Sequence, residues 1–411
     1  MKQSIKILIT VLFVTGYPII ELTAQIVTSN TGNITVIPNT QMSVLGLLNN
    51  TANANFVNNG DLLLYGDITN DGDFLYNSNL SSFGQVQFLG SQNQVISGAN
   101  SLIIQDVFFN NKGTSLLGSI FITGSSDFTN GIIENRAAGG SFIFDGGSIH
   151  LNTSNASHVD GLVTKIGDDE FIFPKGAGGF YRGLSISSPI DINHTFTSQY
   201  HRENSNSTYP HTSREKTINH IDTREYWELE RDQGTGHVLI TLSWNKDTTD
   251  PMILSSTEVL SIVYWNPSQA NWETLPSVVN QSNQTVTTIT TVSGYGIFAL
   301  GVVDQNAGSG GIVVYNALSP NGDGKNDFLR IAGVETIPDN SLEIFNRWGI
   351  RVFETSNYNN TDNLFNGFSQ GRITINKKKK LPSGTYFYIL KYKYMGEDVK
   401  KVGYLYINGS D

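Results

Sequence analysis

Three oxygen-bearing side chains near the C-terminus have the spacing of a cation-binding turn. Asn321, Asp323 and Asp327 alternate with two glycines, and the carbonyl of Lys325 lies between them. Calcium prefers an oxygen-rich turn of this kind. The match to the EF-hand loop is partial, because Lys325 takes the third side-chain place and no distant Glu follows. The alternative is a tight turn in which Asn and Asp side chains hydrogen-bond to their own backbone. Calcium is the one cofactor that the sequence suggests.

Six titratable side chains in one polar stretch form a second candidate, either for a metal site or for a catalytic dyad. They are His201, Glu203, His211, Glu215, His220 and Asp222. Their spacing is irregular, and no helix would place two of the histidines on one face. The pattern therefore favours a solvated loop over a site.

Asp168, Asp169 and Glu170 could supply the paired carboxylates of a glycosidase, which lie roughly 5 to 10 Å apart. They follow Gly167 and precede an apolar run at 171–173, and neighbouring acids in this position are more typical of a turn. The sequence shows no nucleophile elbow, phosphate-binding glycine loop or zinc-binding histidine pair. We therefore predict no catalytic residues and favour a non-catalytic protein, with a secreted hydrolase as the alternative.

The N-terminus has the features of a secretory signal peptide. Lys2 and Lys6 precede an apolar run that extends from Ile7 to Val14, and Ala24 is a small residue suited to cleavage. The apolar run is shorter than the roughly 20 residues that span a bilayer. We predict a signal peptide over residues 1–24 and no transmembrane segment in the mature chain.

Composition narrows the possible partners. The chain lacks cysteine, which excludes disulfides and a lipoprotein anchor, and its net charge is −10. An acidic exported protein does not fit nucleic-acid binding, which depends on neutralising phosphates. Residues 311–411 are nevertheless basic, with 13 Lys and Arg against 10 Asp and Glu. The four lysines from Lys377 to Lys380 could contact acidic surface polysaccharide, and a solvated hairpin loop is the favoured alternative.

Periodicity predicts an all-β protein. Short runs rich in Val, Ile, Thr, Phe and Tyr alternate with Asn, Gly, Asp and Ser from end to end. In residues 25–156 each unit is one short strand and one tight turn, and stacked copies bury a core that no single copy could bury. We favour a β-solenoid over a β-sandwich for this repetitive β region. Alternation at 240–244 and a β-branched run at 286–292 predict a β-sandwich module over residues 157–303. Residues 304–313 are predicted to be a linker.

Residues 314–411 form a further domain with several motifs in a distinctive order. The motif residues are Pro320, Asn321, Gly322, Asp323, Gly324, Asn326, Asp327, Asn346, Arg347, Trp348, Gly349, Pro382, Gly384, Thr385 and Tyr386. In order and spacing they resemble the gliding motility-associated C-terminal domain, the type B sorting domain of the type IX secretion system in secreted surface proteins of the Bacteroidetes type. The resemblance implies that an outer-membrane translocon recognises the folded tail. The 157–303 module is similar to one that precedes such domains in other secreted proteins of this group.

The tail domain can also be read from its periodicity. Phe387 and Ile389 are expected on one face of a strand, and aromatic and aliphatic side chains on the other: Tyr386, Tyr388, Leu390, Tyr392 and Tyr394. A turn at 395–398 returns the chain into a hairpin, which predicts an immunoglobulin-like β-sandwich. We expect a structural Arg347 beside a core Trp348, and the alternative is that the two residues stack or contact the translocon.

These observations predict an exported protein of the cell surface or the medium. The favoured function is a non-catalytic adhesin or envelope component with the translocon as its partner. Surface polysaccharide or other envelope proteins are further candidate partners. The alternatives are a secreted hydrolase and a carbohydrate-binding protein on the same export route, and an exposed row of aromatic side chains on one sheet face would support the latter.

Overall fold

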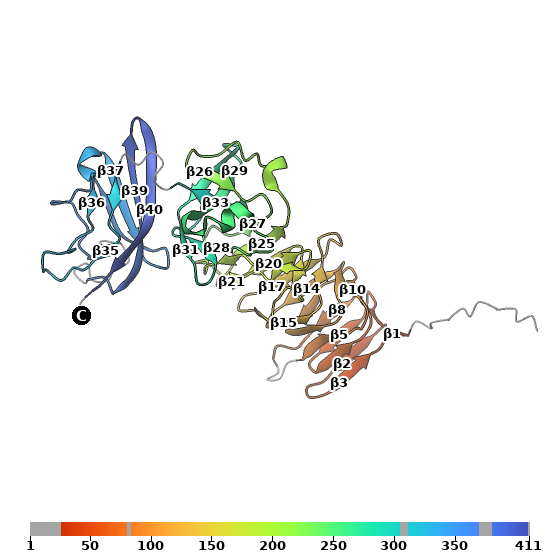
Figure 1. The fold of residues 1–411 in the computed structure, drawn as a ribbon. Helices are drawn as coiled ribbons and strands as arrows, with labels where there is room; N and C mark the ends of the chain where they lie inside the picture. The colour runs from red at the N-terminus through yellow and green to blue at the C-terminus, as the bar shows by residue number, and fades with distance from the viewer. Residues whose placement is uncertain (1–25, 80–83, 305–310, 370–379, 410–411) are drawn as a thin grey trace, which may run out of the picture.

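The computed structural model describes residues 26–79, 84–304, 311–369 and 380–409. The expected signal peptide, most of the expected linker and Lys377 to Lys379 lie outside these residues. Nearly all of the described structure is β, as the sequence predicts, and its repetitive part is a solenoid of about six turns. The solenoid, a middle module and the C-terminal domain follow one another along an elongated molecule (Figure 1).

Each turn of the solenoid contributes one strand to each of three parallel sheets, so the coil has three sides. The first sheet ends in the antiparallel strand β23 (Phe180–Tyr181). Its parallel strands are β1 (Val27–Asn30), β4 (Leu47–Asn50), β7 (Ile68–Asn70), β10 (Gln94–Ser97), β13 (Thr114–Leu116), β16 (Ile133–Glu134), β19 (Val159–Asp160) and β22 (Lys175–Ala177). The third sheet consists of β3 (Gln41–Val44), β6 (Asp61–Leu64), β9 (Gln85–Phe88), β12 (Asp106–Asn110), β15 (Ser125–Asn130) and β18 (Ile149–Leu151).

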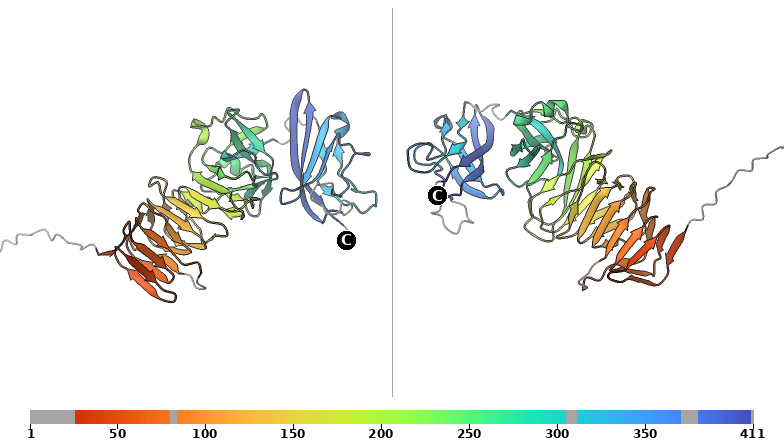
Figure 2. Two further views of the ribbon diagram at one scale, coloured as in Figure 1. Left: turned by 180° about the vertical axis from the view of Figure 1, so that it is seen from behind. Right: turned by 60° about the horizontal axis from the view of Figure 1, so that its bottom comes forward.

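The second sheet runs without a break from the solenoid into the middle module. Its parallel part is β2 (Asn33–Val36), β5 (Asn55–Asn58), β8 (Asp73–Leu75), β11 (Leu102–Ile104), β14 (Ser119–Ile122), β17 (Ser141–Phe144) and β20 (Val163–Ile166). There β20 pairs with an antiparallel strand, and the sheet continues through β25 (Thr195–His201), β27 (Tyr226–Gln233), β33 (Gly296–Val303), β29 (Leu260–Asn266) and β30 (Asn271–Leu275), with β26 (Ile218–Ile221) beside β33. The middle module therefore covers the C-terminal end of the solenoid (Figure 2).

A second, antiparallel sheet completes the middle module. It contains β21 (Phe171–Ile172), β24 (Ser185–Ile186), β28 (Ile240–Ser243), β32 (Thr285–Thr288) and β31 (Ser277–Asn280). Buried residues of both sheets, such as Trp227 and Leu242, belong to one apolar core that extends back to Val36 in the first solenoid turn. A short helix, α1 (Pro251–Leu254), and the 3₁₀ turns η1 (Ser205–Ser207) and η2 (Thr257–Val259) lie in the connections.

Identical side chains stack from turn to turn inside the solenoid. Phe56 lies on Phe74 with ring centroids 5.0 Å apart, and Phe88 lies on Phe109 at 5.1 Å. At one corner Gly46 passes so close to the preceding turn that a Cβ atom there would lie 1.8 Å from the carbonyl oxygen of Ile26. Corner glycines therefore set how closely the turns approach.

A ladder of buried asparagines runs along another corner. Asn30 Nδ2 donates to Asn50 Oδ1 at 2.9 Å, and Asn50 Nδ2 donates to Asn70 Oδ1 at 2.7 Å and to the Asp73 carbonyl at 2.9 Å. All three asparagines are at most 3% exposed. The ladder satisfies polar groups that would otherwise be buried without partners.

The C-terminal domain has its own core and two sheets. The larger sheet has the order β35 (Ala317–Leu318), β40 (Glu397–Ile407), β39 (Gly384–Tyr394), β37 (Asn340–Phe345) and β38 (Arg351–Ser356), and the smaller pairs β34 (Val313–Val314) with β36 (Ile331–Ala332), followed by the 3₁₀ turn η3 (Val334–Thr336). The predicted hairpin is confirmed, since β39 pairs with β40 around a turn at Met395 and Gly396. The predicted faces are also confirmed: Tyr386, Tyr388 and Tyr392 join the domain core, whereas Phe387 faces the other way.

We expect Asn50→Ala to destabilise the solenoid by about 2 kcal/mol, because it leaves the amides of Asn30 and Asn70 buried with fewer partners. The measurement is the urea midpoint followed by far-ultraviolet circular dichroism. Asn33→Ala, at an exposed position of the same region, is the matched control. Equal midpoints for Asn50→Ala and the control would show that the ladder contributes nothing to stability.

Candidate functional site

The predicted calcium turn is closed by its own hydrogen bonds. Both carboxylate oxygens of Asp327 accept backbone N–H groups, from Gly322 at 2.6 Å and from Gly324 at 2.7 Å. The Asp323 carboxylate accepts from the Lys325 N–H and from the Asn321 side chain, which holds the pKa of Asp323 below its usual value. These are the contacts of the alternative interpretation, in which Asn and Asp side chains hold the turn.

The motif Asn346-Arg347-Trp348-Gly349 forms the turn between β37 and β38. Asn346 Oδ1 accepts the N–H groups of Trp348 and Ile350, each at 3.0 Å, and Gly349 has a φ of 72°. The expectation of a core tryptophan is wrong, because Trp348 is 62% exposed at the tip of this turn. The Arg347 guanidinium stacks on its ring at 4.2 Å from the centroid.

The third motif, Pro382 with Gly384, Thr385 and Tyr386, lies at the start of the strand β39. The Tyr386 hydroxyl donates to the Pro382 carbonyl at 3.0 Å, and Gly384 adopts a φ of 154°. Thr385 lies on the outer face of the sheet, opposite Tyr406 of β40. Pro320 from the first motif is also tied to this end of the domain, since its carbonyl accepts from Lys380 Nζ at 2.5 Å.

The prediction of a solvated loop is wrong for the histidines and Asp222, which are folded into the middle module, whereas Glu203 and Glu215 are exposed in a connecting loop. The rings of His201 and Tyr226 stack with their centroids 4.4 Å apart, and His201 Nε2 contacts the Glu228 carboxylate. His211 Nε2 and the Ser205 hydroxyl share a hydrogen bond of 2.8 Å. Burial lowers the pKa of His211 to about 4. Among the described residues, no group of three or more His, Cys, Asp or Glu side chains could hold a metal ion.

Asp222 is the most unusual acid of this stretch. It is fully buried, and it accepts the backbone N–H groups of Arg224 at 2.8 Å and Glu225 at 3.2 Å. Burial, followed by the nearby Glu225 carboxylate, raises the pKa of Asp222 to about 7. Because Asp222 has no exposed surface, we assign it to the packing of the module.

The acidic triplet lies in a bend between β20 and β21. Asp169 forms an ion pair with Lys165 at 2.9 Å and accepts the Gly147 N–H at 2.6 Å. These contacts lower the pKa of Asp169 against the opposing effect of burial, and they give the carboxylate a structural partner.

Sequence reasoning missed the contact between the middle module and the C-terminal domain. The outer face of the larger sheet of the C-terminal domain (the tail sheet) carries four apolar side chains, Phe345, Phe387, Ile389 and Val402. Each is less than 10% exposed, because Ile289 and neighbouring residues of the middle module pack on them. Gly349 fits closely here, since a Cβ atom would lie 3.1 Å from Leu239. The signal in the sequence was the row of apolar residues on the strand face that has no partner within the domain.

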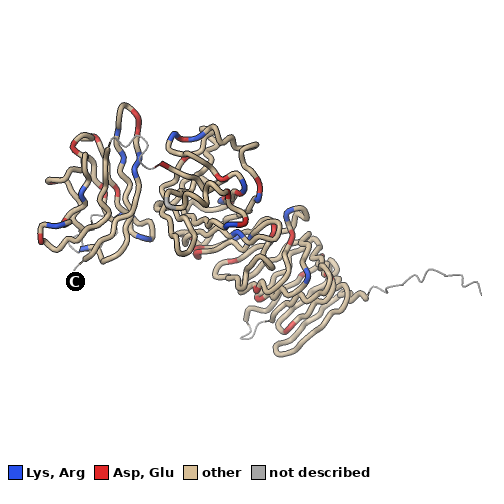
Figure 3. Tube along the Cα trace, in the orientation of Figure 1, with Lys and Arg blue, Asp and Glu red and all other residues tan. Residues whose placement is uncertain are grey.

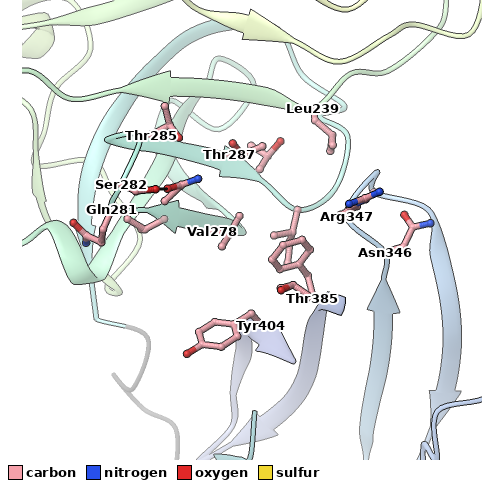
Figure 4. Close-up of a pocket in the computed structure, with 16 residues that line it drawn as sticks. Leu239, Val278, Gln281, Ser282, Thr285, Thr287, Asn346, Arg347, Thr385 and Tyr404 are labelled. Carbon is pink, nitrogen blue, oxygen red and sulfur yellow. Dashed lines mark hydrogen bonds between the residues drawn. The ribbon is translucent and has the colours of Figure 1, made fainter. Parts of the chain in front are cut away.

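Beside this contact lies a groove of about 680 Å³. Figure 4 shows β31 and β32 of the middle module on one side and the turn after β37 with β39 and β40 on the other. The polar part of its lining includes amides, hydroxyls and one guanidinium: Asn280, Gln281, Ser282, Thr285, Thr287, Asn346, Arg347 and Thr385. The lining also contains two aromatic rings and four aliphatic side chains: Phe387, Tyr404, Leu239, Val278, Val279 and Ile289. Such a lining offers hydrogen-bond donors and acceptors together with a flat apolar surface.

Two exposed tyrosines extend the groove along β40. Tyr404 is 51% exposed and Tyr406 is 49% exposed, and they point from the same face of the strand about 7 Å apart along it. Nearby Trp348 is exposed as well. The outer face of the tail sheet is therefore apolar and covered at Val402, and aromatic and open at Tyr406.

The comparisons identify the class of the C-terminal domain. Residues 312–407 match the family described as CHU_C Type IX secretion signal domain. The protein therefore carries a type IX secretion signal, and it is exported by that system to the cell surface or the extracellular space. No curated protein and no solved structure matches the chain. Within the described residues, helices of the length and hydrophobicity needed to cross a membrane are absent.

We expect Asp222→Asn to change how stability depends on pH. Between about pH 4 and pH 7 the folded parent keeps the Asp222 proton that the unfolded chain releases, so parent stability falls as pH rises through this window. The asparagine cannot ionise and retains an oxygen for the Arg224 N–H. The thermal midpoint of the variant, measured at pH 4, 5.5 and 8, should therefore rise relative to that of the parent as pH rises. Exposed Asp247→Asn is the control, and parallel profiles for parent and Asp222→Asn would contradict the assignment.

Phe387→Asp should separate the C-terminal domain from the middle module, because it places a charge in the apolar contact while leaving the domain core intact. The expected result is a larger radius of gyration in small-angle X-ray scattering. Tyr406→Asp, on the same face but outside the contact, is the matched control. Identical scattering of Phe387→Asp and the parent would mean that this contact does not hold the two parts together.

Proposed function

We propose that the chain is a non-catalytic surface protein, an adhesin or envelope component, whose C-terminal domain directs type IX secretion. A signal peptide cleaved after Ala24 first takes it across the inner membrane. The observation that carries the proposal is that the described solenoid and middle module share one continuous core and so form a single rigid, elongated body. The secretion signal domain packs on the end of this body. An extended scaffold of this kind suits display and attachment better than turnover of a substrate.

The position of the secretion motifs supports their role as a surface for the translocon. The turn at Trp348 and the loop from Asn321 to Lys325 are exposed, whereas the apolar face at Phe387 is covered by the body. A calcium ion at the Asn321 loop stays a prediction. Asn321, Asp323 and Asp327 would hold it through oxygens that already accept hydrogen bonds, so the ion would reinforce a turn that closes without it.

Removing Val314–Asp411 should leave the remaining chain in the periplasm, because the type IX secretion signal domain is lost while the signal peptide is kept. The measurement is fractionation into surface, periplasm and medium in the cells that produce the protein. The truncation also uncovers the apolar patch at Ile289, which could trap the body for another reason. Residues 305–411 fused behind a signal peptide and a folded passenger therefore provide the matched arm. Surface delivery of the truncation, or retention of the fused passenger, would contradict the proposal.

One observation favours a second candidate function, carbohydrate binding. The groove lining of amides and hydroxyls continues into Tyr404 and Tyr406, an exposed aromatic row of the kind that stacks on sugar rings. Arg347 at the groove edge would add a charged hydrogen bond to an acidic sugar.

The double variant Tyr404→Ala/Tyr406→Ala should weaken binding of the exported chain to polysaccharide by about 2 kcal/mol, or roughly thirtyfold. The measurement is affinity electrophoresis against a panel of neutral and acidic soluble polysaccharides. Tyr315→Ala is the matched control, because Tyr315 is 48% exposed on the same domain but outside the row. A parent that binds none of the panel, or a double variant that binds as tightly as the parent, would contradict this function.

A further inference from the structure

The two ends of the solenoid differ. At the C-terminal end the second sheet continues into the middle module and the apolar core passes into it without a gap. At the other end β1, β2 and β3 are the first strands of the three sheets, and each has one edge free of any strand in the described residues. Repeat proteins normally close such an end with a polar capping unit.

The core is partly open at this end, where Val36 and Val44 of the first turn are buried and some other inward side chains are not. In the second turn the inward side chains Leu48, Phe56 and Leu62 have no exposed surface. Their counterparts in the first turn are Thr28, Ile34 and Met42, which are in register with them and only partly buried. Large apolar side chains around them are exposed by 49% to 67%: Ile26, Val27, Ile37 and Leu45.

Charge does not protect these edges. The sequence from Ile26 to Gly60 contains no Lys, Arg, His, Asp or Glu, and Figure 3 accordingly draws the first turn in tan, without blue or red. Charged side chains on an edge strand discourage pairing with another strand. The edge strand β38, for example, carries Arg351 and Glu354.

We propose that this face, formed by β1, β2 and β3, binds the same face of a second copy of the chain. The inference rests on the proposed cleavage after Ala24, which makes Gln25 the first residue of the chain, two positions before β1 in the sequence. A second copy fits because this face carries no charged side chain in a chain of net charge −10, so the acidic side chains of two copies repel each other least here. It also fits because the free strand edges of one copy can pair with those of the other, and the two partly open cores can cover each other.

The symmetry of the contact follows from the shape. A two-fold axis perpendicular to the solenoid reverses the direction in which the strands circle it, so facing edges pair antiparallel. With three sides, one strand pairs with its own copy and the other two pair with each other. The C-terminal ends are covered by the middle modules, so the assembly stops at two copies.

The first measurement is the mass of the exported chain by sedimentation velocity at micromolar concentration, together with its N-terminal residue by mass spectrometry. We expect a dimer that begins at Gln25. The variant Thr35→Lys/Leu45→Lys places like charges across the contact and should sediment as a monomer, with at least about tenfold weaker association. Leu117→Lys, which charges a 52% exposed apolar side chain at a turn further along the solenoid, is the matched control and should stay dimeric.

Cross-linking checks the orientation without relying on loss of a dimer. The chain has no cysteine, so Ser29→Cys, Thr35→Cys and Ser43→Cys each introduce a single outward thiol on one of the three edge strands. With a short bismaleimide at least one of them should give a covalent dimer, and Thr129→Cys, exposed on β15, should not.

A monomer that begins at Gln25, or a complex with a different protein at this face, would overturn the inference alone. An exported chain that still carries residues 1–24 would overturn the proposed cleavage and this inference with it.

Discussion

A turn of three short strands cannot bury its own inward side chains, so each turn of the solenoid depends on the turns on either side of it. This constraint explains why identical residues recur in register. Phe56 needs Phe74, and Asn30 needs Asn50, at fixed positions of successive turns. A slip of one residue would turn the inward apolar side chains and the buried asparagines outward and would break the ladder. The same constraint requires both ends of the solenoid to be covered, and the middle module covers one of them.

The change from parallel turns to antiparallel strands is secured by a buried ion pair. Arg182 and Glu225 lie 2.8 Å apart with exposures of 3% and 0%, and Tyr200 donates to the same carboxylate at 2.7 Å. Arg182 also stacks on Trp227 and donates to the Ser243 carbonyl of β28. Burying two charges costs desolvation free energy, which is offset only where every donor and acceptor is placed. The pair therefore fixes how the two sheets of the middle module face each other more than it adds stability.

Local patterns in the sequence predicted the parts of the fold that local chemistry decides. Strand alternation placed Tyr388 inside and Phe387 outside, and the repeated turn chemistry predicted the solenoid. Long-range contacts were not predictable in this way. Arg182 and Glu225 are far apart in the chain and carry no spacing that links them, and the buried His211 and Asp222 look like loop residues because their neighbours are polar. Trp348 was misplaced because hydrophobicity predicts burial, whereas Asn346 fixes a tight turn that holds the ring outside.

The apolar face at Phe387 links the signal domain to the body in a way that the secretion function alone does not require. A domain that served only as a secretion signal could be joined to the middle module by a flexible linker alone, with no apolar contact between the two. Here the outer face of the tail sheet is apolar where the middle module covers it, and where it is open it carries Tyr404 and Tyr406 together with the ion pair of Glu343 and Lys391. The proposed dimer would place two such open faces at opposite ends of the assembly, since the solenoid lies between its first turn and the C-terminal domain (Figure 1). Two weak contacts held on one rigid scaffold bind a repetitive surface more tightly than either contact alone, because the second forms at high effective concentration. The rigidity of the continuous core would then serve attachment directly, by fixing the distance between the two sites.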